Sequence, residues 1–311
     1  MKNVSQVNFY YWHHEENQAV ESMKIAVASG KGGTGKTMVA TSLALSLVET
    51  NQVKLLDCDV EAPNTHLFLH PTFTQEIPAV IRIPKIDPER CTLCGQCVEV
   101  CQFHALAKVG KTIMVFPQLC HGCGSCTWNC PEGAIEEIPN PIGVIEKGLA
   151  LDGIDFTHGK LTLSEPMATP IIRQLKKLEK SSNGTITVID SPPGASCSVV
   201  ETVRGVDFVI LVTEPTPFGF HDLKQMLGIL EDMQIRYGVV INREGIGNAE
   251  LDRYLEQKGI PILMRIPFDK EIARGTAAGK PLVEIDPNYR EKFKDMFQKI
   301  NQITDKSDGR S

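Results

Sequence analysis

The stretch Gly30–Thr37, which reads GKGGTGKT, decides the fold of the larger part of this chain. It follows an apolar run at residues 25–28 and precedes residues 39–47, where apolar side chains recur at helical spacing. A glycine-rich turn between a strand and a helix is the context that a phosphate-binding loop requires. Its backbone N–H groups and the positive end of the new helix attract phosphate oxygens. The stretch therefore predicts a nucleotide site, in preference to an ordinary glycine-rich turn.

Individual residues of this loop have distinct predicted tasks. The glycines let the backbone approach the phosphates, Lys36 reaches the terminal phosphates, and the hydroxyl of Thr37 holds a magnesium ion. The predicted nucleotide-binding residues of the loop are Gly30, Lys31, Gly32, Gly33, Thr34, Gly35, Lys36 and Thr37.

Composition excludes several classes of protein. The chain has 311 residues, with 42% hydrophobic and 23% charged, which is typical of a soluble globular protein with a sizeable core. A net charge of −6 argues against a broad nucleic-acid surface. No apolar stretch reaches the length of a membrane span. Residues 1–22 contain three glutamates and lack the apolar core of a signal peptide, so we interpret them as an N-terminal extension.

Strand and helix patterns alternate along most of the chain. The apolar run Val53–Leu56 ends in Asp57-Cys58-Asp59, and the run Thr185–Ile189 ends in Asp190, as in a Walker B strand whose aspartate serves magnesium. Further strands are expected at residues 207–212, 237–241 and 261–266, with helices at 222–233 and 248–258. This alternation predicts an α/β fold with a mostly parallel sheet and helices on both faces.

Eight of the ten cysteines lie in one short segment. They form two runs with the spacing C-x2-C-x2-C-x3-C, one that starts at Cys91 and one that starts at Cys120, and Pro131 follows the last cysteine. This internal repeat is the pattern of bacterial ferredoxins with two clusters, in which the fourth cysteine of each run binds the other cluster. It predicts two 4Fe–4S clusters, the first held by Cys91, Cys94, Cys97 and Cys130 and the second by Cys101, Cys120, Cys123 and Cys126.

The segment departs from the ferredoxin pattern at one position, and a second kind of metal site has to be considered. Gln102 stands where the ferredoxin pattern usually has proline, so the turn of the first half can differ. Zinc is the alternative occupant, because paired CxxC units also suit tetrahedral thiolate sites, but the interleaved spacing favours iron–sulfur clusters. Trp128 is expected to pack in the core of this small module.

The cysteine segment interrupts the α/β pattern and predicts a division into domains. Residues 23–84 and 141–311 form a discontinuous P-loop ATPase domain, and residues 85–140 form an inserted ferredoxin-like α+β domain. Ten cysteines without a secretion signal indicate a reducing compartment, and we expect a cytoplasmic protein.

The loop carries a second lysine, Lys31, directly after its first glycine. Together with DCDVEAPN at residues 57–64 and DSPPG at residues 190–194, it resembles the deviant Walker A ATPases of the MinD/ParA class. Their relatives include the Mrp-type cluster carriers and the nitrogenase iron protein. The resemblance covers residues 23–84 and 141–290. It implies a homodimer that encloses two ATP molecules, with Lys31 reaching the phosphates of the partner subunit.

The resemblance also implies roles for residues outside the loop. Asp57 and Asp190 would serve the magnesium ion, and Asp59 would orient the attacking water. A switch loop that senses the γ-phosphate would consist of Pro192, Pro193 and Gly194. Asn242 matches the position that reads adenine, although an asparagine after a strand is also a common turn residue.

Two features in the second half of the chain have alternative interpretations. Cys197 lies at the offset from Asp190 at which the nitrogenase iron protein has a cluster ligand, so it is either a bridging ligand or a packed or redox-active free cysteine. A helix with Phe293, Met296 and Ile300 on one face either packs on its own sheet or, as in some relatives, grips a membrane.

These observations predict a magnesium-dependent ATPase whose nucleotide state is coupled to a ferredoxin module. The expected function is electron transfer to a partner protein, without nucleic-acid binding and without membrane attachment. Two alternatives are cluster delivery to an acceptor protein and a positioning ATPase with purely structural clusters.

Overall fold

The computed structural model describes residues 22–179, 184–247 and 249–308, so the predicted N-terminal extension lies outside the described residues except for its last residue. A nine-stranded sheet forms the centre of the molecule, in the order β11-β10-β9-β1-β8-β2-β7-β6-β3. Its strands are β1 (Met23–Ala28), β2 (Gln52–Asp57), β3 (Thr72–Ile86), β6 (Ile135–Leu149), β7 (Asp155–Leu161), β8 (Thr185–Asp190), β9 (Phe208–Thr213), β10 (Tyr237–Glu244) and β11 (Ile262–Pro267).

Neighbouring strands from β11 to β7 run parallel, which confirms the predicted α/β fold. The helices outside the cysteine module are α1 (Lys36–Leu47), α2 (His66–Leu69), α5 (Thr169–Leu178), α6 (Cys197–Val203), α7 (Pro217–Asp232), α8 (Glu250–Lys258), α9 (Lys270–Ala277), α10 (Leu282–Ile285) and α11 (Tyr289–Asp308), with a 3-10 turn η2 (Leu151–Gly153). Every residue of β8 and of β9 is buried, because helices cover both faces of a parallel sheet.

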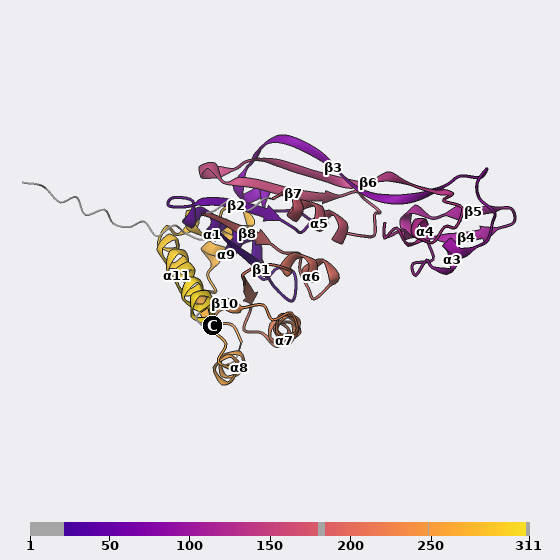
Figure 1. Cartoon of the computed structure of the whole chain (residues 1–311). Helices are drawn as coiled ribbons and strands as arrows, with labels where there is room; N and C mark the ends of the chain where they lie inside the picture. The colour runs from indigo at the N-terminus through magenta and orange to yellow at the C-terminus, as the bar shows by residue number, and fades with distance from the viewer. Residues whose placement is uncertain (1–21, 180–183, 248, 309–311) are drawn as a thin grey trace, which may run out of the picture.

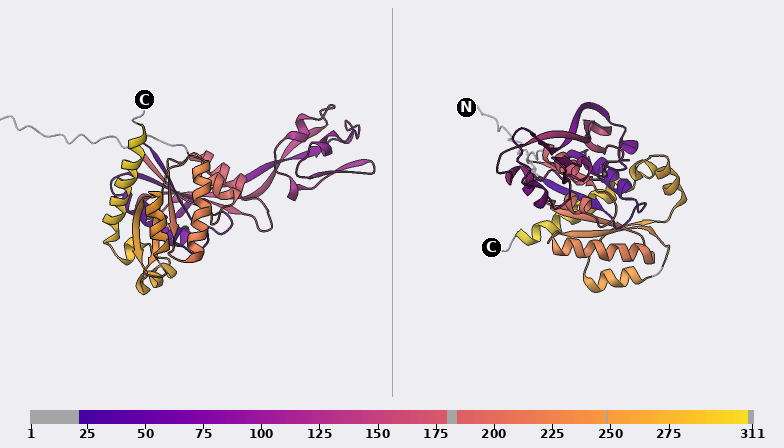
Figure 2. Two further views of the ribbon diagram at one scale, coloured as in Figure 1. Left: turned by 90° about the horizontal axis from the view of Figure 1, so that it is seen from below. Right: turned by 90° about the vertical axis from the view of Figure 1, so that its right-hand side faces the viewer.

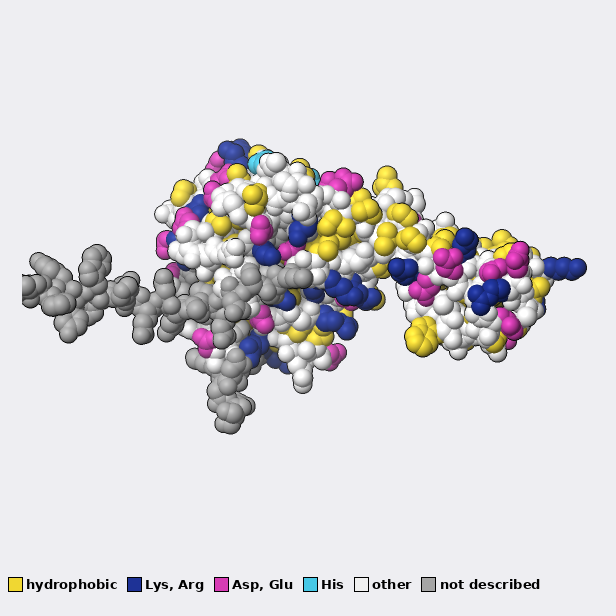
Figure 3. Space-filling model, turned by 45° about the horizontal axis from the view of Figure 1, so that its top comes forward, with side chains coloured by type: hydrophobic (Ala, Val, Ile, Leu, Met, Phe, Trp, Pro, Cys, Tyr) yellow, Lys and Arg dark blue, Asp and Glu magenta, His cyan; other side chains and the backbone are white. Residues whose placement is uncertain are grey.

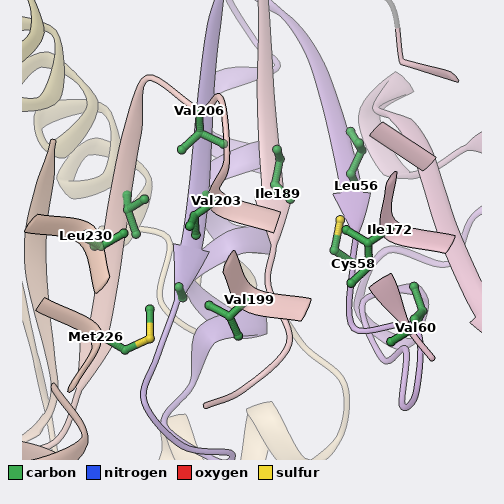
Figure 4. Packing of buried hydrophobic residues seen from close by; sticks show 14 of the residues in the cluster. Leu56, Cys58, Val60, Ile172, Ile189, Val199, Val203, Val206, Met226 and Leu230 are labelled. Carbon is green, nitrogen blue, oxygen red and sulfur yellow. The ribbon is translucent and has the colours of Figure 1, made fainter. Parts of the chain in front are cut away.

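Two apolar cores lie on the two faces of the sheet. One contains side chains of α1 and α11, and the other contains side chains of α5, α6, α7 and α8. Figure 4 shows part of the second core, to which the strands contribute Leu56 and Ile189, α6 contributes Val199 and α7 contributes Met226.

The last helix packs on the protein itself. Phe293, Met296 and Ile300 are completely buried in the core that α11 shares with α1. The alternative that this apolar face grips a membrane is therefore wrong, because the face is already covered. Among the described residues, no helix is long and apolar enough to cross a membrane.

A long two-stranded arm leaves the sheet at its edge. β3 and β6 are antiparallel strands of 15 residues each that pair over nearly their whole length, whereas β7 pairs only with residues 143–149 of β6. Figures 1 and 2 show that the arm projects away from the body and ends in a small module, which Figure 3 shows as a separate lobe. The module is thus joined to the sheet by two paired strands rather than by a loop.

The module consists of two copies of one structural unit. Its elements are α3 (Gln96–Glu99), β4 (Leu106–Val109), β5 (Thr112–Val115), the 3-10 turn η1 (Pro117–Leu119) and α4 (Ser125–Trp128). Leu106 pairs with Val115 in the hairpin β4–β5, and the residues one repeat away from these two, Ile135 and Ile86, pair with each other in the arm. The sequence repeat is therefore a repeat of strand register too.

The two copies share unusual backbone angles. Leu93 has φ +60°, and Gly122, its counterpart in the second copy, has φ +63°. Residues Cys97, Leu106, Ile113, Cys126 and Ile135 form the core of the module. Trp128 does not belong to this core, because its side chain is 90% exposed, so the prediction that it packs there was wrong.

Candidate functional site

The loop Gly30–Thr37 connects β1 to α1, and the helix begins at Lys36. Gly35 has φ +96° and precedes the helix. A Cβ atom at Gly30 would lie 2.4 Å from the carbonyl oxygen of Asp222, and one at Gly35 would lie 2.5 Å from Nδ2 of Asn242. Glycine is required at both positions because the loop passes against its neighbours without space for a side chain.

Two aspartates meet the loop at the ends of neighbouring strands. β2 ends at Asp57 and β8 ends at Asp190, and the two residues are paired in the sheet. The hydroxyl of Thr37 donates to Oδ2 of Asp190 at 2.7 Å and to Oδ1 of Asn64 at 2.9 Å. The structure thus brings Thr37, Asp57 and Asp190 together at the carboxyl ends of the strands, where open α/β sheets bind ligands.

Asp57 is held by the backbone of the segment that follows it. Its Oδ1 accepts from the N–H of Asp59 at 3.0 Å, and its Oδ2 accepts from the N–H groups of Asn64 and Thr65 at 3.1 Å each. The hydroxyl of Thr65 in turn donates to Oδ2 of Asp190 at 3.1 Å. Thr65 was missed in the sequence analysis, although it directly follows the DCDVEAPN stretch.

The paired carboxylates fit a divalent cation. Burial and the charge of Asp190 raise the pKa of Asp57, and burial raises the pKa of Asp190 against the opposing charge of Lys36. Oδ1 of Asp190 is buried without a hydrogen-bond partner among the described residues. A buried carboxylate oxygen without a partner costs free energy. A magnesium ion bound by this oxygen and by the Thr37 hydroxyl would offset that cost.

The loop itself fits phosphate groups. The hydroxyl of Thr34 is buried and also has no hydrogen-bond partner in the described part of the chain. The side chain of Lys36 is only 7% exposed. Burial raises the pKa of Asp59, and the nearby charge of Lys36 opposes this rise. Thr34, Lys36 and the start of α1 thus form a buried, positive cradle.

Replacing Asp190 with asparagine should stabilise the nucleotide-free protein and weaken magnesium-dependent nucleotide binding. The pKa of Asp190 is higher in the folded protein than in the unfolded chain. The folded protein therefore loses stability as the pH rises from the pKa of the unfolded chain to that of the folded protein, because the buried carboxyl must then become charged. The amide removes this charge and can still accept from Thr37 and Thr65, so we expect a gain of about 1–2 kcal/mol at pH 7. Thermal melts of both proteins from pH 5 to pH 8 measure it, and a less stable variant at pH 7 would contradict this account.

Lys31 is held by an acidic residue of its own chain. Its Nζ lies 3.1 Å from Oε2 of Glu214, a buried carboxylate directly after β9 whose Oε1 lies 2.6 Å from Nη1 of Arg243. Arg243 also donates to the carbonyl oxygen of Gly33 at 3.3 Å. Glu214 and Arg243 were not predicted from the sequence, although both lie at the carboxyl ends of strands on the β9 side of β1.

Asn242 lies beneath the loop. Its Nδ2 donates to the carbonyl oxygen of Thr34 at 2.8 Å, and its Oδ1 accepts from the N–H of Arg243 at 2.9 Å. In this structure the side chain therefore braces the phosphate loop, and its role in reading adenine stays a prediction.

The expected switch loop lies beside the phosphate loop. Gly194 has φ +90°, and its N–H donates to the carbonyl oxygen of Ser29 at 3.0 Å. Pro192 is buried, whereas Pro193 is partly exposed. Cys197 begins α6 and is exposed. None of these contacts tests the switch role or the bridging role of Cys197, which stay predictions.

The eight clustered cysteines line two pockets in the module, four in each. Cys91, Cys94, Cys97 and Cys130 line the first pocket, and Cys101, Cys120, Cys123 and Cys126 line the second. The fourth cysteine of each run therefore lies with the first three of the other run. In both halves a backbone N–H donates to the Sγ of that fourth cysteine at 3.3 Å, from Ala105 to Cys101 and from Ala134 to Cys130.

Each pocket is lined by cysteines from both runs, which is the interleaved ligand set of ferredoxins with two clusters. In the described part of the chain, no group of three or more histidine, cysteine, aspartate or glutamate side chains could hold one metal ion. Iron–sulfur clusters as the occupants of the pockets, and zinc as the alternative, stay predictions.

Comparisons with known proteins agree with the fold. Residues 25–282 match the family model described as the CobQ/CobB/MinD/ParA nucleotide binding domain. An uncharacterized protein of Methanocaldococcus jannaschii is 32% identical over 282 residues, which cover 90% of this chain and 97% of that protein. An iron-sulfur cluster carrier protein of the same organism is 23% identical, over 92% of this chain and 86% of the relative.

Among solved structures, the septum site-determining protein MinD of Pyrococcus horikoshii, complexed with Mg-ADP, has the same fold. The TM-score is 0.55 with 18% identity, and the alignment covers 91% of this chain and 97% of that protein. The P-loop, the two strand-end aspartates and the matched family model lead to one conclusion. The chain belongs to the CobQ/CobB/MinD/ParA family of nucleotide-binding proteins.

Proposed function

We propose that the chain is an ATP-hydrolysing protein that delivers electrons to a partner from a module with two 4Fe–4S clusters, in step with its nucleotide state. The observation that carries this proposal is the position of the cysteine pockets. They lie at the end of two strands that belong to the same sheet as the nucleotide site. A change at the nucleotide site, in the middle of the sheet, would reach the arm at its edge through β2 and β7.

The nucleotide part of the proposal rests on the phosphate loop. Lys36 would hold the terminal phosphates of ATP, and Thr37, Asp57 and Asp190 would hold magnesium directly or through water. Asp59 would orient the attacking water. Dimerisation would move Lys31 from Glu214 to the phosphates of the partner subunit, where it would act like an arginine finger.

The iron–sulfur part rests on the two cysteine pockets. Cys91, Cys94, Cys97 and Cys130 would hold one cluster, and Cys101, Cys120, Cys123 and Cys126 the other. Bound clusters would supply one-electron redox chemistry at low potential. The peptide N–H groups of Ala105 and Ala134 would stabilise the thiolates of Cys101 and Cys130.

A junction between the nucleotide site and the arm supports coupling between the two parts. His158 on β7 is the sheet neighbour of Asp57, and its buried Nε2 lies 2.7 Å from Oε2 of Glu146 on β6. The ring of Phe73 on β3 stacks on His158 with 4.9 Å between centroids. The ring of His66 meets His158 edge-on at 5.5 Å. Both strands of the arm therefore contact a residue next to the proposed magnesium site.

Two other functions have specific support. Cluster delivery is favoured by relatives that are named iron-sulfur cluster carrier proteins. A positioning ATPase is favoured by the fold of MinD. We prefer electron transfer because each pocket offers four thiols to its cluster, and a complete ligand set opposes release.

Lys31→Ala should lower the ATPase rate at least about tenfold, since an inserted cation stabilises the charge of the transition state. Glu214→Gln is the matched variant, because it removes the ion pair that holds Lys31 at 3.1 Å and leaves the lysine in place. We expect it to retain activity. Steady-state phosphate release measures both, and equal rates for Lys31→Ala and the unaltered protein would contradict the proposed role.

Anaerobic purification with iron, sulfide and zinc analysis tests the proposed function. We expect about eight iron and eight sulfide per chain. The reduced protein is then mixed with an oxidised ferredoxin or with an apo-ferredoxin as probe acceptors. Electron delivery predicts oxidation with the iron retained, whereas cluster delivery predicts that iron appears on the apo-ferredoxin. Zinc in place of iron would refute both.

A further inference from the structure

The two cysteine loops of the module provide an internal comparison. The N–H of Asp87 donates to the carbonyl oxygen of Ala134 at 2.8 Å, and at the equivalent positions of the other copy the N–H of Phe116 donates to that of Ala105 at 2.8 Å. Both loops also carry one exposed cysteine, Cys94 in the first and Cys123 in the second. Because the backbones are equivalent, differences between their surfaces reflect the side chains and not the fold.

Four large apolar residues in and near the second pocket are exposed. Trp128 is 90% exposed, Leu119 49%, Phe103 39% and Phe116 37%. The residues one repeat of 29 positions away, in the other copy, are Glu99, Arg90, Glu132 and Asp87, in the same order. All four equivalents are charged, as expected for a surface that faces water. The same backbone thus carries a charged rim around one pocket and an apolar rim around the other.

The apolar side chains gather around the second pocket. Phe103 and the ring of His121 both line it, and they stack on each other with 3.6 Å between centroids. Cδ1 of Trp128 lies 3.7 Å from the Cβ position of Gly124, another lining residue. We call Phe103, His121 and Trp128 the aromatic rim.

A tryptophan that is almost fully in water does not help the module to fold. Burying such a side chain in an interface contributes a few kcal/mol, and tryptophan is among the residues that dominate binding energy. The charged residues that line the second pocket are Arg82 and Glu137, which have opposite charges. Nη1 of Arg82 donates to the carbonyl oxygen of Glu137 at 3.1 Å. The rim itself contains no aspartate, glutamate, lysine or arginine, and the two charges that line the pocket balance each other.

We propose that the aromatic rim is the docking surface for a redox partner protein, which covers the second pocket with an uncharged apolar face. This inference rests on the proposed function. It places the transfer of electrons between this protein and its partner at the second pocket. The rim exposes an apolar area on the order of a few hundred Å², well below the roughly 800 Å² per partner of a stable interface. Weak redox encounters are the class of complex with such small interfaces, so the size argues for a transient partner and against a second copy of this chain.

Site-specific photo-crosslinking in cells of the source organism tests the surface. The photoreactive residue p-benzoylphenylalanine replaces Trp128 in the full chain, and the matched control carries it in place of Glu99, the equivalent position of the first loop. We expect the variant at position 128 to capture a flavin, iron–sulfur or other redox protein, identified by mass spectrometry, and the control to capture none. Capture of a second copy, of a protein without a redox centre, or of nothing at position 128 would overturn the proposal.

Kinetics with the captured protein provide a second readout. Trp128→Ala should raise the partner concentration that gives half-maximal electron transfer at least about tenfold, and this effect should persist at high salt because the interface is apolar. Glu99→Ala should leave it unchanged. The iron content and the reduction by dithionite should be the same in both variants. A protein without clusters would contradict the proposed function itself, whereas intact clusters with equal kinetics in both variants would contradict only the docking surface.

Discussion

Replacing Lys36 with alanine should reduce ATP hydrolysis by about 10²–10³-fold, the usual cost of removing one group that stabilises transition-state charge. Lys36 is the first residue of α1, and its side chain is buried beside Asp59 and Asp190. Lys31, the other lysine of the loop, is paired with Glu214 in this structure and would contact the nucleotide of the partner subunit in the dimer, so it would not replace Lys36. Nucleotide binding should fall with the rate, since the ammonium group contacts the phosphates in the ground state as well.

Phosphate release and equilibrium binding of ATP measure this effect. The iron content and the circular dichroism spectrum of Lys36→Ala serve as controls, because the loop lies far from the module in Figure 1. Unchanged binding in a folded variant would mean that the loop Gly30–Thr37 does not hold the phosphates.

Single cysteine variants should each remove one whole cluster, and the pairing of the cysteines should decide which one. Cys97 and Cys130 lie in the same pocket although they belong to different runs, whereas Cys97 and Cys101 belong to one run but to different pockets. Each serine variant should lose about half of the iron, about four of eight atoms per chain.

Double variants make the test decisive. Cys97→Ser combined with Cys130→Ser should lose no more iron than either change alone, because both act on one cluster. Cys97→Ser combined with Cys101→Ser should lose nearly all of it. Iron and sulfide analysis measures both, and the opposite result would show that each run binds its own cluster.

The local patterns of the sequence predicted much of this molecule. The phosphate loop and the cysteine runs are contiguous motifs, so their residue types and spacing alone indicated their geometry. Trp128 shows the limit of that reasoning. Large apolar residues are mostly buried, and nothing in one sequence distinguishes such a residue from one that is exposed at the surface.

The arm was harder to predict for a physical reason. Pro78 and Pro84 in β3, and Pro139 and Pro141 in β6, argue against strands in the interior of a sheet. β3 lies at the edge of the sheet, and beyond residue 143 towards the module β6 pairs with β3 but not with β7, so both strands tolerate proline. The inserted segment of residues 85–140 consequently begins inside β3 and ends inside β6. The pair of Lys31 with Glu214 is a contact between distant residues that no local pattern encodes.

Nucleotide bound at the loop Gly30–Thr37 should change the redox behaviour of the proposed clusters at the end of the arm. We would test this coupling by an anaerobic redox titration, followed by electron paramagnetic resonance, of the purified protein with Mg·ATP, with Mg·ADP and without nucleotide. We predict that Mg·ATP shifts the midpoint potential of at least one cluster and that Lys36→Ala shows no shift. Titration curves that superimpose under all three conditions, in a protein with both clusters and bound ATP, would contradict the account.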